Sequence, residues 1–186
     1  MRGNLYIVAG CSGVGKGTIL KKFLERNNNV KFSISATTRS PRVNEEDGVN
    51  YFFISKEEFK AEIENDAFLE WAEFSGNFYG TKKVFVEKTL NKGIDVLLEI
   101  EVRGAKQVKE KMPEAISVFI MPPSLEELEA RLRGRQTEDE ETIQRRLNEA
   151  AREIEAGKDF DYRVVNDNIE DAILQLEKIY NSTKGE

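Results

Sequence analysis

The sequence contains no histidine, one cysteine and no long apolar run among its 186 residues. A single cysteine, Cys11, cannot form an intrachain disulfide, which suits a reducing compartment. No stretch approaches the roughly 18 apolar residues of a membrane span. The apolar run Leu5–Ala9 is also too short for the apolar region of a signal peptide. We therefore expect a cytoplasmic protein with no membrane partner.

Positive charge is also scarce. The chain has 28 Lys and Arg residues against 34 Asp and Glu residues, which gives a formal net charge of −6. Proteins that bind nucleic-acid backbones usually carry a basic face, so we expect no nucleic-acid partner. Apolar residues make up 39% and charged residues 33%, as in ordinary globular proteins. The length allows one buried core with room for a small inserted lobe.

Short apolar segments alternate with amphipathic ones along most of the chain. The apolar segments predict strands at Leu5–Ala9, Asp95–Ile100, Ile116–Met121 and Tyr162–Val165. Helical spacing follows them around Ile19–Leu24, at Ala105–Met112, after a capping box of Ser124 and Glu127, and at Ile169–Tyr180. The polar tail after Asn181 is expected to fray. This alternation predicts an α/β fold, a parallel sheet core flanked by helices.

The segment from Val49 to Gly80 has a different pattern. Two aromatic-rich, strand-like runs, Tyr51–Ile54 and Phe68–Phe74, flank a short helix that begins with a second capping box, Ser55 and Glu58. We interpret this segment as a small mixed β/α lobe inserted in the main fold.

A glycine-rich loop follows the first predicted strand and precedes the first predicted helix. It matches the phosphate-binding pattern G-x-x-x-x-G-K, with the residues Gly10, Cys11, Ser12, Gly13, Val14, Gly15, Lys16, Gly17 and Thr18. Backbone N–H groups in such a loop converge on phosphate oxygens, and the lysine adds a full positive charge. The alternative is a chance glycine cluster at a tight turn, which the strand–loop–helix context disfavours. Gly17 stands where a Mg²⁺-binding Ser or Thr is usual, so the loop's metal contact stays open.

Further motifs in the same order resemble the guanylate kinase family of nucleoside monophosphate kinases over nearly the whole chain. They are residues 33–42, Gly48–Tyr51, Glu70–Phe74, Gly76–Thr81, Glu99–Gly104 and Arg131–Arg135. The resemblance implies one guanylate-kinase-like domain. Its core would be residues 1–34 and 82–186, its GMP-binding lobe about 35–81, and a helical lid about 125–146.

The resemblance implies a phosphate site for GMP at Arg39, Arg42, Tyr51 and Tyr79. The two arginines flank a turn at Pro41 and can fork onto one dianionic phosphate. The tyrosines would add their hydroxyl groups. The alternatives are a solvated basic loop for the arginines and a packing role for the tyrosines.

By the same resemblance, Glu70, Ser35 and Thr81 would read the guanine base. One carboxylate can accept hydrogen bonds from both N1–H and N2–H₂ of guanine, whereas adenine presents a bare N1 lone pair there. Taken alone, a glutamate in a half-buried strand would more often face solvent.

Glu99 and Glu101 lie at the carboxyl end of a predicted buried strand, where open α/β sheets bind ligands. The resemblance places Glu99 near the water shell of Mg²⁺ and Glu101 near the guanosine. The family usually has aspartate at the second position, so the contact of Glu101 is open in detail.

Arginines surround the polar segment Gly134–Glu141. The resemblance implies that Arg131 and Arg146 contact the ATP phosphates, that Arg135 lies near the adenine, and that Asn166 touches the adenine. For Arg133 and Arg145 we favour a charged helix surface with ion pairs.

The implied reaction is phosphoryl transfer from ATP to GMP, with dGMP as a further acceptor, in purine nucleotide metabolism and GMP recycling. The attacking phosphate oxygen is already anionic, so a chain without histidine needs no strong base. Lys16, Arg39, Arg131 and Arg146, together with Mg²⁺, would stabilise the transferring group. The partners would be ATP and GMP, and the chain a monomer or small homo-oligomer. The alternatives are a non-catalytic binding module and a kinase of another phosphorylated acceptor.

Overall fold

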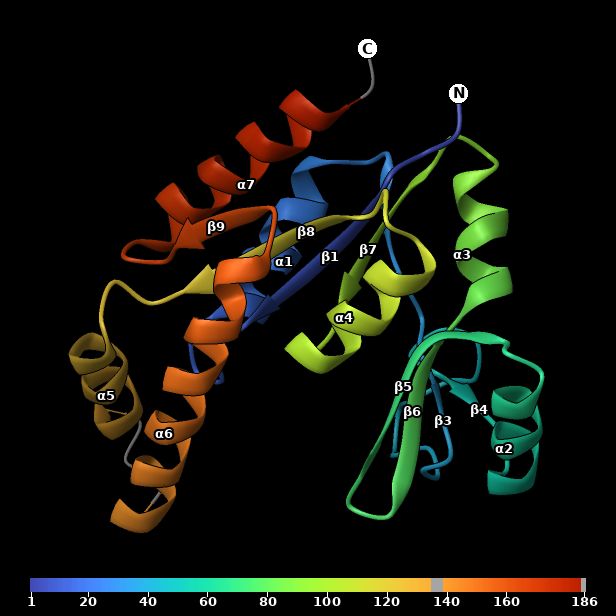
Figure 1. Ribbon diagram of the computed structural model, residues 1–186, viewed down its shortest axis with the longest axis horizontal. Coiled ribbons are helices and arrows are strands. Elements are labelled where there is room, and N and C mark those ends of the chain that lie inside the picture. The colour runs from blue at the N-terminus through green and yellow to red at the C-terminus, as the bar shows by residue number, and fades with distance from the viewer. Residues whose placement is uncertain (135–138, 185–186) are drawn as a thin grey trace. The chain divides into compact units, whose positions relative to one another are not determined.

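The structure is a computed structural model that describes residues 1–134 and 139–184 (Figure 1). The chain folds into two compact units. The first unit contains Met1–Tyr6, Asn29–Glu99 and Arg103–Ala115, and the second contains Ile7–Asn28, Ile100–Val102 and Ile116–Glu186. Each unit therefore uses segments that are far apart in the sequence.

A five-stranded sheet has the order β2-β7-β1-β8-β9. Its strands are β1 (Leu5–Gly10), β2 (Val30–Phe32), β7 (Asp95–Glu99), β8 (Ile116–Met121) and β9 (Tyr162–Val165). In the first unit β2 pairs parallel with β7, and in the second β8 pairs parallel with β9. Every residue of β1 is buried, as its apolar sequence predicts. The predicted strands and the α/β class are confirmed.

A second sheet lies in the first unit and has the order β4-β3-β6-β5. It consists of β3 (Ala36–Thr37), β4 (Phe52–Phe53), β5 (Phe68–Phe74) and β6 (Asn77–Lys82). The last two strands form a long hairpin, visible in Figure 1. β3 pairs parallel with β4 and antiparallel with β6, so this sheet is mixed.

Helix α2 (Lys56–Glu64) packs on the second sheet through Phe59, whose ring stacks on Phe68 with centroids 4.3 Å apart. The predicted capping box is present. The Ser55 side chain accepts from the Glu58 N–H, and the Glu58 carboxylate accepts from the Ser55 N–H. A small aromatic core therefore supports the sheet that carries Glu70 and Thr81.

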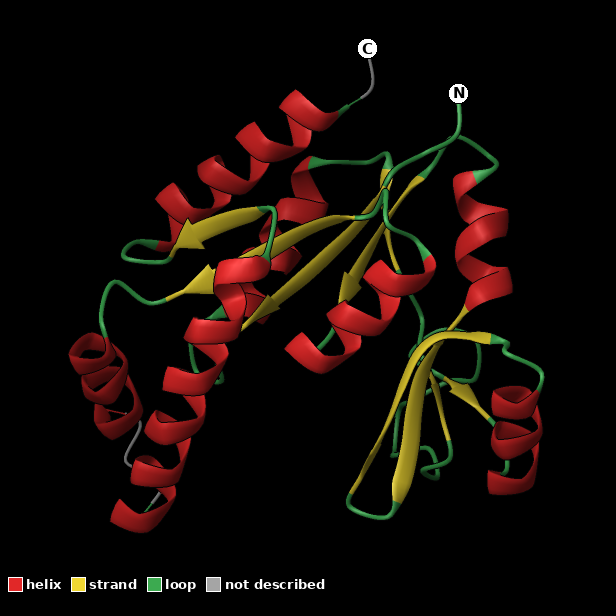
Figure 2. Ribbon diagram, viewed as in Figure 1, coloured by secondary structure: helices red, strands yellow, loops and turns green. Residues whose placement is uncertain are grey.

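The remaining helices are drawn red in Figure 2. They are α1 (Lys16–Arg26), α3 (Lys83–Leu90), α4 (Val102–Lys111), α5 (Leu125–Gly134), α6 (Glu140–Ala156), the short 3₁₀ helix η1 (Gly157–Asp159) and α7 (Ile169–Thr183). Within the second unit, Phe23 of α1 meets Tyr180 of α7 edge to face, with ring centroids 5.5 Å apart. No helix in residues 1–134 and 139–184 is long and apolar enough to cross a membrane.

Some predicted boundaries and contacts were wrong. Ser124 accepts from the Glu127 N–H as expected, but the Glu127 carboxylate pairs with Arg131 Nε at 3.1 Å, because a cation one helical turn away is the stronger partner. The tail remains helical to Thr183, whose hydroxyl donates to the Ile179 carbonyl.

The observed bounds of some strands and helices also differ from the predicted ones. The predicted strand 51–54 shrinks to β4, whose pairing with the equally short β3 limits its length. The helix predicted at 105–112 begins at Val102. The strand predicted at 95–100 ends at Glu99.

Candidate functional site

The phosphate loop, residues 10–18, joins β1 to α1 in the second unit. Gly13 has φ 84° and Gly15 has φ 89°, in the left-handed region that favours glycine. A Cβ on Gly10 would lie 2.4 Å from the carbonyl oxygen of Ile120. Only glycine fits these positions, and the loop leads directly into a helix N-terminus. A loop with this backbone can present N–H groups to an anion.

Asn166, directly after β9, holds the loop from outside. Its Nδ2 donates to the Val14 carbonyl oxygen at 2.6 Å, and its side chain is almost fully buried. Its Oδ1 is buried and has no hydrogen-bond partner among the described residues. A Cβ on Gly15 would lie 3.0 Å from Nδ2. The structure therefore places this predicted adenine contact against the phosphate loop.

Glu153 on α6 contacts the other side of the loop, where its carboxylate accepts from the Ser12 N–H. Burial raises the pKa of Glu153, and the nearby Glu149 raises it further. The Ser12 hydrogen bond and the charge of Lys16 act in the opposite direction. A half-buried carboxylate thus stands at the loop that would receive phosphate.

Lys16 and Cys11 complete the loop. Lys16 Nζ lies 3.5 Å from the Gly10 carbonyl oxygen, and no other Lys or Arg occurs in residues 10–18. Cys11 is buried, and its thiol points at the Ala150 carbonyl with Sγ···O of 3.8 Å. Burial raises the pKa of Cys11 to about 12, with help from Glu153. The thiol is therefore protonated at neutral pH, which leaves Cys11 as a packing residue.

The predicted lid spans α5 and the start of α6. Arg131 donates from Nη1 to the Asn166 carbonyl at 2.8 Å and from Nη2 to the Asp167 carbonyl at 3.2 Å. Arg146 is half-buried on α6. Arg133 pairs with both Glu129 and Glu140, which confirms its interpretation as a helix-surface residue. Arg135 lies outside the described residues.

In the first unit, Glu70 and Thr81 meet across the β5–β6 hairpin. They are register partners next to an irregularity between Phe68 and Glu70. Thr81 Oγ1 donates to Glu70 Oε1 at 2.6 Å, and Glu70 is only 7% exposed. The solvent-facing alternative for Glu70 is therefore wrong. A Cβ on Gly104 would lie 3.0 Å from Glu70 Oε2, so a glycine leaves room beside the carboxylate.

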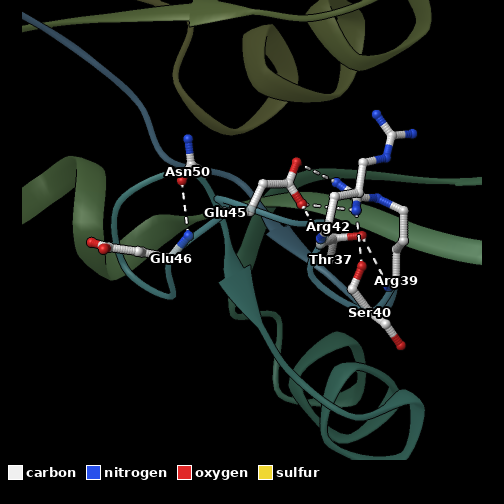
Figure 3. Close-up of polar contacts among 7 residues, drawn as sticks. All are labelled: Thr37, Arg39, Ser40, Arg42, Glu45, Glu46 and Asn50. Carbon is white, nitrogen blue, oxygen red and sulfur yellow. Dashed lines mark hydrogen bonds and ion pairs between the residues drawn. The ribbon is translucent and has the colours of Figure 1, made fainter.

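Arg39 lies in the long loop between β3 and β4 and forms a bidentate ion pair with Glu45 (Figure 3). Nη1 donates to Oε2 at 2.9 Å, and Nη2 donates to Oε1 at 3.0 Å. Nη1 also donates to the Ser40 carbonyl at 2.8 Å. The guanidinium stacks over the rings of Tyr51 and Phe53, with Cζ 5.4 and 5.9 Å from their centroids. These contacts fix the charged group in one orientation.

Other predicted phosphate ligands surround this ion pair. The Arg42 side chain is exposed, while its backbone N–H donates to Glu45 Oε2 at 2.7 Å. Tyr51 and Tyr79 meet edge to face with centroids 6.4 Å apart, and the Tyr79 hydroxyl shares a hydrogen bond with Arg39. Ser35 is half-buried, and its carbonyl accepts from Phe52 N–H. The structure thus brings Arg39, Tyr51 and Tyr79 together.

Glu99 ends β7, and Glu101 lies in the turn before α4; both are exposed. No group of three or more acidic, histidine or cysteine side chains suited to a metal occurs in the part of the chain that the structure describes. Mg²⁺ usually binds through one or two carboxylates, water and substrate phosphates, so this donor set fits a metal carried by a nucleotide. A Cβ on Gly17 would meet nothing within 4 Å, so packing does not exclude a side chain there.

Sequence reasoning missed two acidic residues at these sites, Glu45 and Glu153. Glu45 lies three residues after Arg42 in a loop, where no periodic pattern marks it. Glu153 lies three residues after the buried Ala150 on the inner side of α6. That helical spacing was the available signal, because a carboxylate on the buried side of a helix needs a partner.

These features define a phosphate-loop, nucleotide-binding α/β protein with a second anion-binding lobe. The guanylate kinase family model matches residues 2–183. A guanylate kinase from Prochlorococcus marinus subsp. pastoris is 52% identical over 178 residues, which cover 96% of this chain and 97% of that protein. The guanylate kinase of Clostridioides difficile strain 630 is 51% identical, with 98% and 89% covered.

A crystal structure of guanylate kinase from Anaplasma phagocytophilum is also similar, with a TM-score of 0.75 and 33% identity. The match covers all of this chain and 88% of that chain. The chain belongs to the guanylate kinase family. The resemblance noted in its motifs is confirmed.

Proposed function

We propose that this chain catalyses transfer of a phosphoryl group from ATP to GMP, which yields ADP and GDP. The observation that carries the proposal is the family match over residues 2–183, joined to full-length guanylate kinase relatives at about 50% identity. The reaction would serve purine nucleotide metabolism and the recycling of GMP. The enzyme would act in the cytoplasm as a monomer or small homo-oligomer, and dGMP would be a second acceptor.

In this proposal the first unit binds GMP. The buried Glu70 carboxylate accepts from the two donors on the guanine edge, and Thr81 and Ser35 supply hydroxyl groups. Glu101 would contact the guanosine. The phosphate is held by the guanidinium groups and phenol hydroxyls of Arg39, Arg42, Tyr51 and Tyr79. The support is the pairing of Glu70 with Thr81 and the ordered Arg39.

The second unit binds ATP. The phosphates lie on the N–H groups of the loop, residues 10–18, with Lys16 as its cation. Arg131 and Arg146 add charge at the phosphates, and Arg131 would have to leave the carbonyls that it now contacts. Arg135 and Asn166 would lie near the adenine. Loop glycines with left-handed φ support this arrangement.

The chemistry is in-line attack by an anionic GMP phosphate oxygen, which needs no proton removed. The residues of the chain therefore orient both phosphates, exclude water and stabilise the charge on the transferring group. Lys16, Arg39, Arg131 and Arg146 carry this stabilisation. Mg²⁺ bound by the nucleotide phosphates, with Glu99 holding a coordinated water, would supply further positive charge.

A coupled ADP-release assay tests the function. We expect turnover with GMP and dGMP, and at most a few per cent of that rate with AMP, CMP and UMP. Excess chelator should stop the reaction, and added Mg²⁺ should restore it. Equal rates with AMP and GMP, or no turnover with any acceptor, would reject the proposal in favour of another kinase or a binding module.

A further inference from the structure

Glu45 is the acidic residue with the most contacts in the Arg39 loop. Its two carboxylate oxygens accept hydrogen bonds from Nη1 and Nη2 of Arg39, and Oε2 also accepts one from the Arg42 N–H (Figure 3). The side chains of Arg39 and Glu45 are 17% and 19% exposed. The arginine holds the pKa of the Glu45 carboxyl below its usual value, so this residue is charged at neutral pH. The ion pair is therefore ordered and partly shielded from water.

The pair leaves one edge of the guanidinium untouched by the carboxylate. Arginine has five N–H donors in a fixed fork. Glu45 takes one hydrogen from each terminal nitrogen, and the Ser40 carbonyl takes the other from Nη1. The Tyr79 hydroxyl also lies beside this guanidinium. The opposite edge, formed by Nε and the second hydrogen of Nη2, has the spacing that binds two oxygens of a phosphate.

Stacking and pairing restrict Arg39 in different ways. The rings of Tyr51 and Phe53 hold the guanidinium near their faces, but this contact does not select which N–H edge points outward. The bidentate carboxylate makes that selection, because it binds one particular edge. Together they define which edge of the arginine faces the ligand.

We propose that Glu45 is a positioning residue for the GMP phosphate: it clamps the outer edge of Arg39 so that the Nε–Nη2 edge receives the phosphate oxygens. This rests on the proposed function, in which Arg39 binds that phosphate. Glu45 also cancels one positive charge beside a dianion, and this effect alone would weaken phosphate binding. The two effects differ in sign, and preorganisation outweighs the cancelled charge, since an unclamped arginine would otherwise lose side-chain entropy on binding.

The test is Glu45→Gln, with Glu46→Gln as its matched control. The control makes the same chemical change one residue along the same loop, at a carboxylate that Figure 3 shows pointing away from the arginines. Calorimetry would give the Kd of the full chain for GMP and for guanosine. Steady-state rates would give kcat at saturating GMP.

We expect Glu45→Gln to raise the Kd for GMP about tenfold, which is the effect of one misplaced charge-assisted hydrogen bond. Guanosine affinity should stay within about twofold, because guanosine has no phosphate, whereas kcat should fall together with GMP affinity, because Arg39 is also proposed to stabilise the transferring group. Glu46→Gln should bind GMP within about twofold of wild type. These readouts separate a phosphate-positioning role from general damage to the lobe.

Unchanged or tighter GMP binding in Glu45→Gln would overturn the inference, and so would an equal loss of guanosine affinity. A wild-type chain that binds GMP no more tightly than guanosine would instead reject the phosphate site itself. Melting curves of both variants should match wild type within a few degrees, since Glu45 lies in a surface loop.

Discussion

At the scale of single residues, Glu70 is the residue that we propose determines which base the enzyme accepts. Its carboxylate is buried and already accepts a hydrogen bond from Thr81. Further donors can therefore bind only at the remaining lone pairs of the two carboxylate oxygens. Guanine supplies two such donors, whereas adenine places a lone pair against the charge. In this proposal, selectivity comes from the penalty of leaving a buried carboxylate without its donors.

We predict that Glu70→Gln lowers kcat/KM for GMP about ten- to a hundredfold, because the amide keeps the size but loses the charge and one acceptor. The Kd for ATP should change less than about twofold. Glu73→Gln, on the exposed side of the same strand, is the control. A GMP effect below threefold, or a parallel loss of ATP binding, would remove Glu70 from base recognition.

Lys16 is the other residue whose role can be tested alone. Lys16→Met removes the only full positive charge from residues 10–18 and should lower kcat at least about a hundredfold. Lys22→Met, at an exposed position on α1, should leave kcat within twofold. Near-normal turnover in a folded Lys16→Met protein, checked by circular dichroism, would contradict the phosphate-loop assignment.

The sequence predicts the identity of these residues better than their contacts. The motif gives Lys16 and the glycines because backbone geometry requires those residue types. The pairing of Glu70 with Thr81 depends on strand register beside an irregularity, which no local pattern reveals. Glu45 lies in a loop without periodicity, so only the folded chain shows that it clamps Arg39.

At the scale of elements, long and strongly patterned segments are predictable and short ones are not. β1 and β8 are almost entirely apolar and were expected from sequence. β3 and β4 have two residues each and exist because they pair with each other and with β6. The predicted limits of α4 and α7 were wrong by about three residues, as expected where caps and packing set the ends.

Helix α6 contributes more than a charged surface, because Glu153 brings a half-buried carboxylate to the phosphate loop. Its pKa is raised, so the folded state keeps this proton to a higher pH than the unfolded state does. The stability that the protonated form contributes is present at low pH and is lost as pH rises through the folded-state pKa. The neighbouring charges of Glu149 and Glu101 raise the pKa of Glu153 further, whereas the Ser12 N–H and Lys16 lower it.

We predict that Glu153→Gln, which mimics the protonated carboxyl at every pH, has a higher Tm than wild type at pH 8 and a similar Tm near pH 4. The amide oxygen can still accept from the Ser12 N–H. Glu155→Gln, an exposed position on the same helix, should show no such trend. Thermal melts from pH 4 to 8 measure the difference, and a gap that shrinks as pH rises would contradict the assigned direction.

At the scale of the whole molecule, a chain with net charge −6 is proposed to bind two polyanions. Net charge governs solubility and long-range attraction, but the bound phosphates experience the groups near them. In the proposal these are loop N–H groups and Lys16 in the second unit, and Arg39, Arg42 and two tyrosines in the first unit. Each unit would therefore have its own anion site, built from local geometry.

This division predicts that each nucleotide stabilises its own unit. A ligand at about a hundred times its Kd raises the free energy of local unfolding at its binding site by about 2.7 kcal/mol. Hydrogen exchange of the amides that this unfolding exposes then slows about a hundredfold. In hydrogen exchange read by mass spectrometry, GMP alone should protect peptides from residues 35–81. A non-hydrolysable ATP analogue alone should protect peptides from residues 7–28. Glu70→Gln should reduce only the first effect and Lys16→Met only the second, each measured at ligand concentrations that saturate wild type. Equal protection of both segments by either nucleotide would show that the two units do not bind independently.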